Sequence, residues 1–332
     1  MPPPSSASPR TLGRSGITVS RLGLGCTTFG REISESDSFA LMDFAVANGI
    51  TLFDTAEAYG GGQARAYRKD RLGIDDTREV SDEMHSSEKI IGRWFKARGT
   101  RDRVTLVTKV TRHFTPEHVR SALQASLTRL QTDRVDAYLY HSYDAGTPPE
   151  DAATALDDVI SAGLARTGGC SNFSGPQLQA ALDTSAQLNR RRFEVVQLPY
   201  NLLQSGHAAF PIIQRDQIGL MAYSPLAAGF LSGKYTPDRS TVPKGTRFDV
   251  IPAHADLYFN ERNFRRVAQL HALAADVVVP PLQLAMAWTL QQPWVTTVLV
   301  GARTEAHLAN ALTALAMPFD PAWHQRIAQW ET

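Results

Sequence analysis

Eight short runs of apolar and β-branched residues alternate with longer stretches of helical period along most of this chain. This alternation predicts repeated strand–helix units, in which the strands are parallel and covered on both faces. The predicted strands are residues 22–25, 50–54, 104–109, 135–141, 164–171, 193–198, 218–224 and 295–301. Strands of this kind can close into a ring that leaves no sheet edge, the (β/α)8 or TIM barrel. An open, doubly wound sheet is the alternative for the same pattern.

Two of the intervening helices have clear start signals. Thr115-Pro116-Glu117 offers an N-cap, a first-turn proline and an acidic first turn, and Ser174-Gly175-Pro176 repeats the arrangement. Helices that begin directly after a strand fit the strand–helix repeat.

The length of 332 residues allows two ordinary domains or one large barrel. No linker divides the chain, so we expect a single barrel domain over residues 10–332 behind a flexible, Pro- and Ser-rich tail at residues 1–9. Residues 60–86 and 225–260 form unusually long connections after the second and seventh strands. In a barrel both would lie on the catalytic face, the first as a substrate-facing lid or a flexible loop.

Charge and composition narrow the possible partners. A hydrophobic share of 43% excludes a disordered chain, and a net charge of +1 gives no field that favours nucleic acid or an anionic membrane. No stretch approaches the roughly 18 apolar residues of a membrane span. Cys26 and Cys170 are too few for a disulfide framework. We therefore expect a cytoplasmic protein with a small-molecule partner, no nucleic acid and no membrane, as a monomer or weak homo-oligomer.

Two further motifs are set aside. Gly23-Leu24-Gly25 begins like a Rossmann fingerprint, but Thr28 stands at the third glycine position. His113 and His118 have a spacing that predicts different faces of a helix, and no HExxH pair occurs. We expect no metal site.

Polar residues gather where the predicted strands end, which is the active-site face of a barrel. Asp54, with Tyr59 close behind, Lys109 and His141 follow three successive strands. Each alone has a structural explanation, as a strand-end cap, a rim aromatic, a surface cation or a core histidine. Together they form an acid–base set: the lysine lowers the pKa of the phenol, and the aspartate keeps the ammonium in place. A phenol of this kind can protonate a carbonyl oxygen while hydride reaches the carbon.

Several motifs together resemble the aldo-keto reductase superfamily, from Leu12 to about Leu315. LGRSGITVSRLGLGCTTFG is similar to the family's N-terminal hairpin and first strand, and FDTAEAYGGG to the segment that bears its catalytic Asp and Tyr. VTKV, YHSYD, GGCSNFS, VVQLPYN, AYSPLAAGFLSGKY and VLVGAR follow in the family's order. The resemblance implies a single (β/α)8 barrel with an N-terminal β-hairpin and long βα loops on the catalytic face.

The resemblance also implies residue roles. Tyr59 would be the general acid, Lys109 would depress its pKa, Asp54 would pair with Lys109, and His141 would orient the substrate carbonyl. The residues expected to bind the cofactor are Ser171, Asn172 and Gln197 at the nicotinamide carboxamide, Tyr223 stacked on the ring, Ser224, Leu226, Gly229 and Lys234 at the pyrophosphate, and Gly301, Arg303 and His307 near the last helix. Arg303 at that helix start would meet a 2′-phosphate, which favours NADP over NAD.

The predicted function is NADPH-dependent reduction of an aldehyde or ketone. Many family members place a Trp after the catalytic histidine, whereas Ser142 stands there in this chain, and the smaller side chain suggests a bulky substrate such as a keto-sugar or a natural-product ketone. Two other functions remain open. Lys109 could act as a Schiff-base nucleophile in a barrel lyase, or the barrel could hold NADP as a regulatory subunit.

Overall fold

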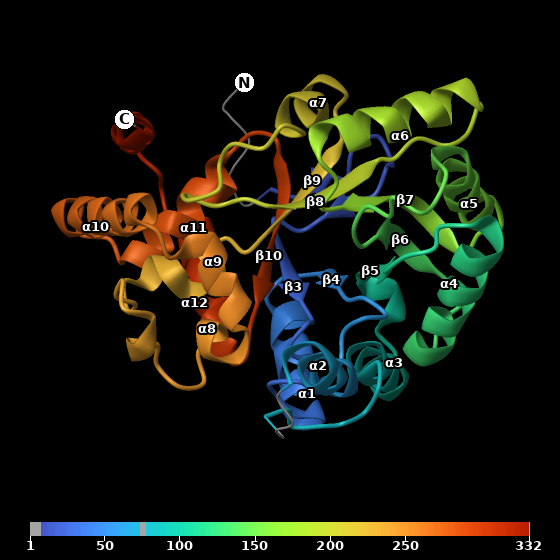
Figure 1. Cartoon of the computed structure of the whole chain (residues 1–332), viewed down its shortest axis with the longest axis horizontal. Helices are drawn as coiled ribbons and strands as arrows, with labels where there is room; N and C mark the ends of the chain where they lie inside the picture. Colours follow the sequence, from blue (N-terminus) through green and yellow to red (C-terminus); the bar gives the residue numbers. More distant parts are fainter. Residues whose placement is uncertain (1–7, 74–77, 332) are drawn as a thin grey trace.

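The computed structural model describes residues 8–73 and 78–331 (Figure 1). Its central feature is a closed barrel of parallel strands in the order β10-β3-β4-β5-β6-β7-β8-β9. The strands are β3 (Leu22–Gly25), β4 (Leu52–Asp54), β5 (Thr105–Val110), β6 (Val135–Tyr140), β7 (Ala165–Ser171), β8 (Val195–Pro199), β9 (Gly219–Tyr223) and β10 (Val295–Gly301). Because β10 pairs with both β3 and β9, the predicted barrel is confirmed and the open sheet is excluded.

Two strands have the predicted bounds, and the others shift by no more than two residues at either end. Local hydrogen bonds explain the shifts. The backbone N–H of Ile50 donates to Ala45, which ties it to the preceding helix rather than to the sheet. Ser224 adopts a positive φ of 53°, which takes it out of the last predicted position of β9.

Helices cover the outside of the barrel (Figure 1). They are α1 (Glu35–Ala47), α3 (Ser86–Arg98), α4 (Pro116–Leu130), α5 (Pro149–Ser161), α6 (Gly175–Gln187), α7 (Phe210–Arg215), α10 (Glu261–Asp276), α11 (Pro281–Gln291), α12 (Glu305–Ala316) and α13 (Pro321–Ala328). Both predicted start signals mark helix starts. Ser174 forms a full capping box with Gln177, whereas Thr115 occupies the N-cap position without a capping bond from its side chain.

The apolar core has two layers. A large cluster fills the space between the strands and the helices. A smaller one lies inside the barrel and includes Leu52, Val107, Leu139, Val195, Met221 and Leu299. The antiparallel hairpin β1 (Arg10–Thr11) and β2 (Thr18–Val19) adds Leu12, Ile17 and Val19 to this inner cluster. The predicted hairpin is therefore confirmed, and it plugs the amino-terminal end of the barrel.

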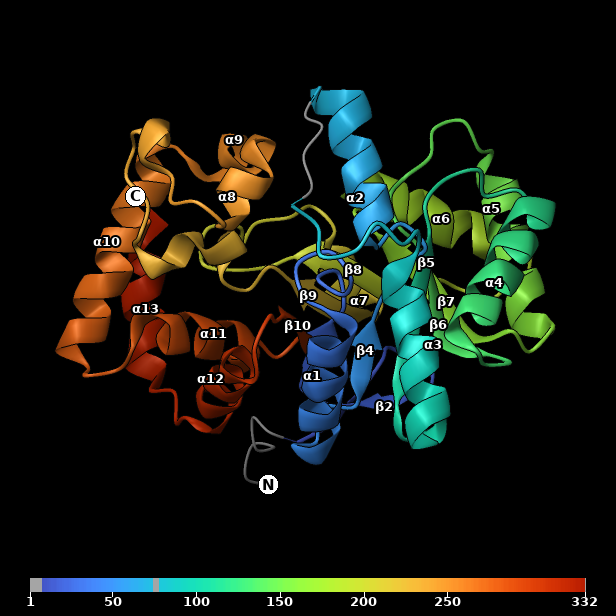
Figure 2. The same cartoon turned by 90° about the horizontal axis from the view of Figure 1, so that it is seen from below.

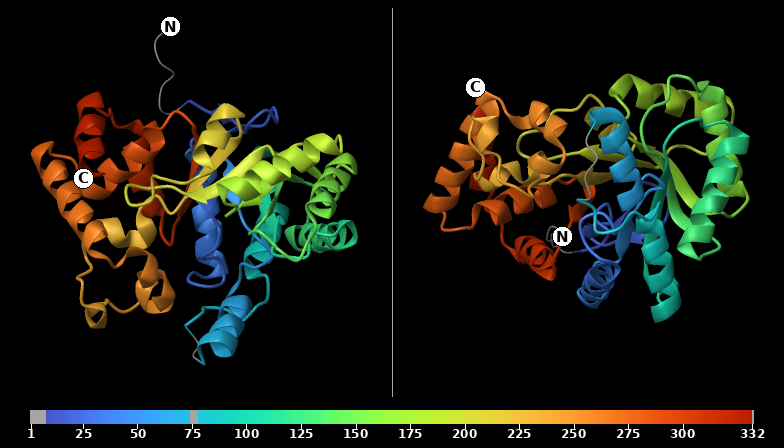
Figure 3. Two further views of the ribbon diagram at one scale, coloured as in Figure 1. Left: turned by 45° about the horizontal axis from the view of Figure 1, so that its top comes forward. Right: turned by 60° about the horizontal axis from the view of Figure 1, so that its bottom comes forward.

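The two long connections carry short helices and project from the end of the barrel opposite the hairpin (Figures 2 and 3). The first contains α2 (Gly61–Tyr67) and the π-helical turn η1 (Arg68–Leu72). The second contains η3 (Ala227–Ser232), η4 (Arg239–Thr241), α8 (Arg247–Val250), η5 (Pro252–His254) and α9 (Ala255–Tyr258). They touch each other, because Arg78 donates to the carbonyl of Asp249 at 3.0 Å. The role of residues 60–86 as a lid stays a prediction.

Two sequence expectations change, and a third falls mostly outside the described residues. Arg303 does not precede the last helix, because α13 follows α12. His113 lies before α4 rather than on it, and its ring stands 5.8 Å from that of His118, so the argument from helix faces was wrong. The predicted tail at residues 1–9 falls mostly outside the described residues, since the description begins at Ser8.

Among the described helices, none is by itself long and apolar enough to cross a membrane. The pair α10 and α11 passes a test of length and composition only when taken together, and it bends by 99°.

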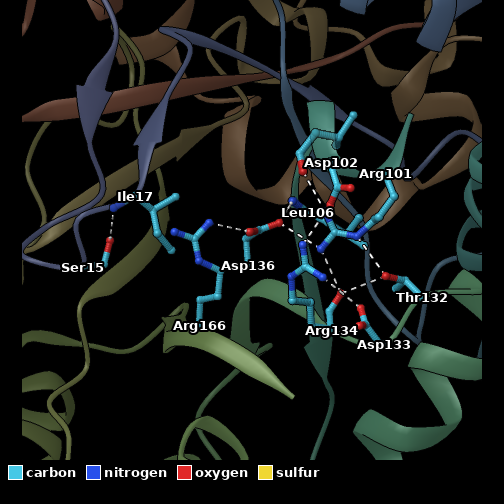
Figure 4. Close-up of polar contacts among 11 residues, drawn as sticks. Ser15, Ile17, Arg101, Asp102, Leu106, Thr132, Asp133, Arg134, Asp136 and Arg166 are labelled. Carbon is cyan, nitrogen blue, oxygen red and sulfur yellow. Dashed lines mark hydrogen bonds and ion pairs between the residues drawn. The ribbon is translucent and has the colours of Figure 1, made fainter. Parts of the chain in front are cut away.

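The amino-terminal end of the barrel holds a buried carboxylate of its own (Figure 4). Asp136, the second residue of β6, accepts from Arg166 at 2.9 Å, from Arg101 at 3.0 Å and from the backbone N–H of Leu106 at 2.9 Å. This cluster ties β5, β6 and β7 together where the strands begin.

Candidate active site

The four predicted catalytic residues meet at the carboxyl ends of three neighbouring strands. Asp54 is the last residue of β4, Lys109 is the penultimate residue of β5, and His141 follows β6 directly. Tyr59 lies on the turn after β4. Because β4, β5 and β6 are adjacent in the barrel, these side chains converge on one mouth.

A buried ion pair forms the base of the site. The Nζ of Lys109 lies 2.8 Å from the carboxylate of Asp54 and also donates to the carbonyl of Thr55 at 2.8 Å. The other carboxylate oxygen accepts from Nε2 of Gln197 at 2.8 Å. Burial by itself lowers the pKa of Lys109, but Asp54 and Tyr59 reverse this effect, and the net shift is upward. The lysine is therefore a charged ammonium with little freedom to move.

Tyr59 stands above this pair. Its hydroxyl is 3.5 Å from Nε2 of His141, and the two rings meet edge to face with centroids 5.4 Å apart. Nζ of Lys109 lies 4.9 Å from the centre of the phenol ring. The start of α3 holds the turn in place, because Ser87 donates its backbone N–H to Tyr59 and its hydroxyl to Cys26. The phenol is thus fixed between an ammonium and an imidazole.

The pKa of Tyr59 differs from the sequence expectation. Burial raises it, and this effect exceeds the lowering by Lys109, so the net pKa lies above the ordinary value of a tyrosine. The expectation of a net shift towards neutrality was wrong, because desolvation of the phenolate outweighs one nearby positive charge. The consequence is a phenol that keeps its proton at neutral pH.

His141 is a neutral imidazole at the pH of most cells. Burial, followed by repulsion from Lys109, lowers its pKa to about 3. Its Nδ1 is buried and has no hydrogen-bond partner within the described part of the chain. Its Nε2 faces the tyrosine hydroxyl, so the imidazole can act as a hydrogen-bonding group there without carrying charge.

The residues expected at the nicotinamide surround the same mouth. Asn172 follows β7 with a positive φ of 61°, and its amide donates to the carbonyl of His141 at 2.9 Å and to Ser171 at 3.0 Å. Tyr223, the last residue of β9, donates its hydroxyl to Asn172 at 2.7 Å. Gln197 is nearly fully buried, and its side-chain amide donates an N–H to Asp54. Contacts of these residues with a cofactor stay predictions.

The expected phosphate-binding segment follows β9. A run of positive φ angles at Ala227 (50°), Ala228 (56°) and Gly229 (85°) starts three residues after Ser224, and Leu226 precedes η3. A backbone of this shape forms concave nests that bind anions. Lys234 lies against it, since a Cβ built on Gly229 would stand 3.8 Å from the lysine Nζ.

A second group of cations lies after β10. Arg303 comes two residues after Gly301, the strand end, and just before α12. Burial and then Arg303 lower the pKa of Lys234, and the pKa of His307 is lowered by burial, Arg303 and Lys234 in that order. Lys234 and Arg303 therefore bring two positive charges close together, with the imidazole of His307 beside them. The donor set fits a polyanion such as the phosphates of a dinucleotide.

Sequence reasoning missed Arg31, Glu32 and Arg247 at this end of the barrel. Glu32 pairs with Arg31 and, at 3.3 Å, with Arg247. The signal that could have found the first two is their place in the connection after the first barrel strand, on the catalytic face. Arg247 lies within the long 225–260 segment, and nothing in the sequence indicates where that segment folds back.

The cavity with the larger volume does not coincide with this site. A cavity of about 490 Å³ is lined by residues of the connection after β8, including Gln204 and His207, together with Arg262. It contains none of the four residues described above. Their convergent hydrogen bonds and charges mark the active site instead.

A model of the aldo/keto reductase family matches residues 21–331, nearly the whole length of the barrel. The chain belongs to the aldo/keto reductase family. The match confirms the resemblance seen in the motifs, and it extends beyond residue 315 to include α13. Enzymes of the aldo/keto reductase family are oxidoreductases that act on carbonyl compounds and use nicotinamide cofactors.

One relative within this family is the uncharacterized oxidoreductase YrpG of Bacillus subtilis (strain 168). It is 31% identical over 328 residues, which cover 93% of this chain and 91% of YrpG. The similarity therefore extends over most of both proteins.

Proposed function

We propose that this aldo/keto reductase reduces an aldehyde or ketone to the alcohol with NADPH, and that Tyr59 is the general acid. The observation that supports this best is a protonated phenol beside a charged, buried ammonium. Lys109 is fully buried and paired with Asp54, and its Nζ lies 4.9 Å from the ring of Tyr59. Such a phenol is a proton donor, and Lys109 offsets part of the cost of burying its anion.

The residues of this chain would divide the work as follows. NADPH, when bound, supplies hydride to the carbonyl carbon. The Tyr59 hydroxyl donates its proton to the carbonyl oxygen, and Lys109 stabilises the phenolate that remains. Asp54 keeps the ammonium charged and fixed. The neutral His141 donates or accepts a hydrogen bond at Nε2 and so orients the carbonyl beside the phenol.

NADP is the proposed cofactor because cations gather where its phosphates would lie. Ser171, Asn172 and Gln197 would hold the carboxamide, and Tyr223 would stack on the ring. The segment from Ser224 to Gly229, with Lys234, would hold the diphosphate, and Arg303 with His307 would hold the 2′-phosphate. The repulsion between Lys234 and Arg303 would be relieved by such a ligand.

A Schiff-base lyase is disfavoured by the same geometry. A lysine nucleophile has to lose its proton, whereas the contact with Asp54 contributes to a raised pKa of Lys109. Borohydride treatment with an aldehyde should leave no adduct on Lys109. The regulatory alternative requires that the barrel binds NADP without turnover.

The deciding experiment uses the purified full chain with NADPH or NADH and a panel of aldehydes and ketones that includes keto-sugars. Turnover is followed by loss of reduced-nicotinamide absorbance. We expect repeated turnovers with NADPH and lower kcat/KM with NADH. Binding of NADPH without turnover of any carbonyl would contradict the proposal and favour the regulatory role. The exposed Ser142 supports a bulky ketone, and a strong preference for small aldehydes would reject that part.

A further inference from the structure

Three arginines from three different connections meet one carboxylate at the active-site end. Glu32 pairs with Arg31, with Arg247 at 3.3 Å and with Arg303 at 3.9 Å. Burial alone would raise the pKa of Glu32, but the arginines lower it overall. One negative charge faces three positive charges, so the cluster carries an uncompensated positive charge in a partly buried place.

Arg31 lies close to the catalytic phenol. Its loop packs against the segment that carries Tyr59, because a Cβ built on Gly61 would stand only 2.4 Å from the carbonyl oxygen of Gly30. The positive charge of Arg31 contributes to lowering the pKa of Tyr59. The guanidinium is only 12% exposed, and its Nε has no hydrogen-bond partner among the residues that the structure describes.

Arg247, the first residue of α8, is the second partly buried arginine that pairs with Glu32. Burial and repulsion by Arg31 lower its pKa to about 10, while Glu32 and Tyr59 act in the opposite direction. His254 adds no further positive charge, because burial and then the two arginines lower its pKa to about 4 and leave it neutral. Arg31 and Arg247 therefore have only a share of one carboxylate to balance their two positive charges.

We propose that the carbonyl substrate carries an anionic group, a carboxylate or a phosphate ester, and that Arg31 and Arg247 bind this group at the rim beside Tyr59. This inference rests on the proposed function and adds the substrate class. Guanidinium groups bind both kinds of anion through paired, charge-assisted hydrogen bonds. The two arginines act together as specificity determinants, because both contact the same carboxylate oxygen of Glu32.

The same chemistry could serve a phosphate of the cofactor, and position favours the substrate. The third arginine of the cluster, Arg303, stands beside Lys234 and His307, where the cofactor phosphates are expected. Arg31 instead belongs to the loop that packs against the segment of Tyr59, the group that meets the carbonyl, and Arg247 shares Glu32 with it. The cluster thus has a cofactor end and a substrate end.

The test compares matched aldehydes that differ in charge. One pair is 4-carboxybenzaldehyde and methyl 4-formylbenzoate, and the other is 4-formylphenyl phosphate and 4-methoxybenzaldehyde. With NADPH, we expect kcat/KM to be at least tenfold higher for the anionic member of one pair, mainly through KM. In Arg31→Gln and Arg247→Gln this ratio should fall towards one. Equal kcat/KM within both pairs for the unsubstituted protein would overturn the proposal.

Two further variants distinguish a loss of anion binding from a folding defect. Glu32→Gln removes the competing carboxylate, so the preference for the anionic aldehyde should rise about threefold above that of the unsubstituted protein. Arg166→Gln, at the opposite end of the barrel, should leave both the preference and the turnover unchanged. A fall of the preference in Glu32→Gln would contradict the assignment of the arginines.

One readout distinguishes a substrate anion from a phosphate of the cofactor. A second tests the anion subsite separately from the proposed reductase activity. NADPH affinity is measured by fluorescence; a tenfold loss in Arg31→Gln with an unchanged substrate preference would assign the cluster to the cofactor and overturn the inference. If no aldehyde is turned over, the proposed function fails by itself. Calorimetric binding of 4-(hydroxymethyl)benzoate then tests the subsite alone, since binding that is equal in the unsubstituted protein and in Arg31→Gln would overturn it.

Discussion

The two ends of the barrel bury a carboxylate to the same extent, and only one of them forms the candidate active site. Asp54 and Asp136 are each 4% exposed, and each accepts hydrogen bonds from a cation and from a second N–H donor. By burial and pairing alone the two aspartates cannot be told apart.

The difference lies in the cations and in what stands next to them. At the amino-terminal end, the side chain of Arg166 is 53% exposed and that of Arg101 is 15% exposed, so water solvates both guanidinium groups. At the carboxyl-terminal end, Lys109 is sealed from water and the phenol of Tyr59 lies against it. A buried carboxylate marks a functional site when its partner is also sealed and a proton donor is in contact with that partner.

The largest effect should come from removing that proton donor. Tyr59→Phe deletes the hydroxyl and leaves the ring, so kcat should fall by roughly 10²- to 10⁴-fold while the fold and NADPH binding persist. Steady-state kinetics and tryptophan fluorescence measure the two quantities. Near-normal kcat in the variant would remove the functional distinction between the two ends.

Neutralising each of the two buried aspartates in turn tests the difference between the two ends of the barrel. Asp54→Asn leaves the ammonium of Lys109 buried without a counter-ion and should lower the free energy of unfolding by about 3–5 kcal/mol. Asp136→Asn should cost about 1 kcal/mol, because Arg166 is solvated and Arg101 keeps the carbonyls of Val104 and Arg134 as acceptors. Urea denaturation compares the two variants. Equal losses would mean that sealing of the partner cation does not matter.

Acid should weaken the catalytic end through His141. Its pKa is about 3 in the folded protein against 6.5 for an ordinary histidine, so below pH 6.5 the unfolded chain binds a proton that the folded protein does not. Stability is therefore lost as pH falls from 6.5 towards 3, at up to about 1.4 kcal/mol per pH unit.

The measurement is the free energy of unfolding at pH 7.5 and pH 5.0. Replacement His141→Asn should reduce the difference between these two values by about 2 kcal/mol. The exposed His118 provides a control, since His118→Asn should leave the pH dependence as it is. An unchanged dependence in His141→Asn would show that this imidazole is not held neutral by burial.

The smallest effect concerns the phosphate side of the catalytic end. Arg303→Gln should raise the Kd for NADPH about tenfold, or about 1.4 kcal/mol, with little change for NADH, because only the former has a 2′-phosphate. Arg166→Gln at the other end serves as the matched control and should change neither value. Equal weakening of both cofactors would assign Arg303 to a phosphate that they share.

Much of the architecture could be predicted from local pattern. Parallel strands that are buried on both faces produce continuous β-branched runs, and for this reason the run at residues 295–301 has the bounds of β10. The start of α6 at Ser174 was likewise visible, because a capping box is a local motif. The position of Asp54, Lys109 and His141 followed from the rule that barrel strands end on the active-site face.

Longer-range features could not be predicted in the same way. The pKa of Tyr59 depends on how completely neighbouring segments exclude water, and no local pattern measures that. The pairing of Glu32 with Arg247 joins residues 215 positions apart, across two connections that have no periodic signal. Gln197 was expected at a cofactor, which stays a prediction, and the hydrogen bond from its amide N–H to Asp54 was not foreseen.

By itself, the order of apolar runs and strand-end residues determined a closed barrel and the four residues that share its mouth, because both follow from the period of each segment and the direction of its strand. The tertiary structure alone decided that the phenol keeps its proton, that the lysine stays charged, and that three arginines share one carboxylate. These properties depend on solvent exclusion and on charges brought together from distant parts of the chain, and both exist only once the barrel has closed.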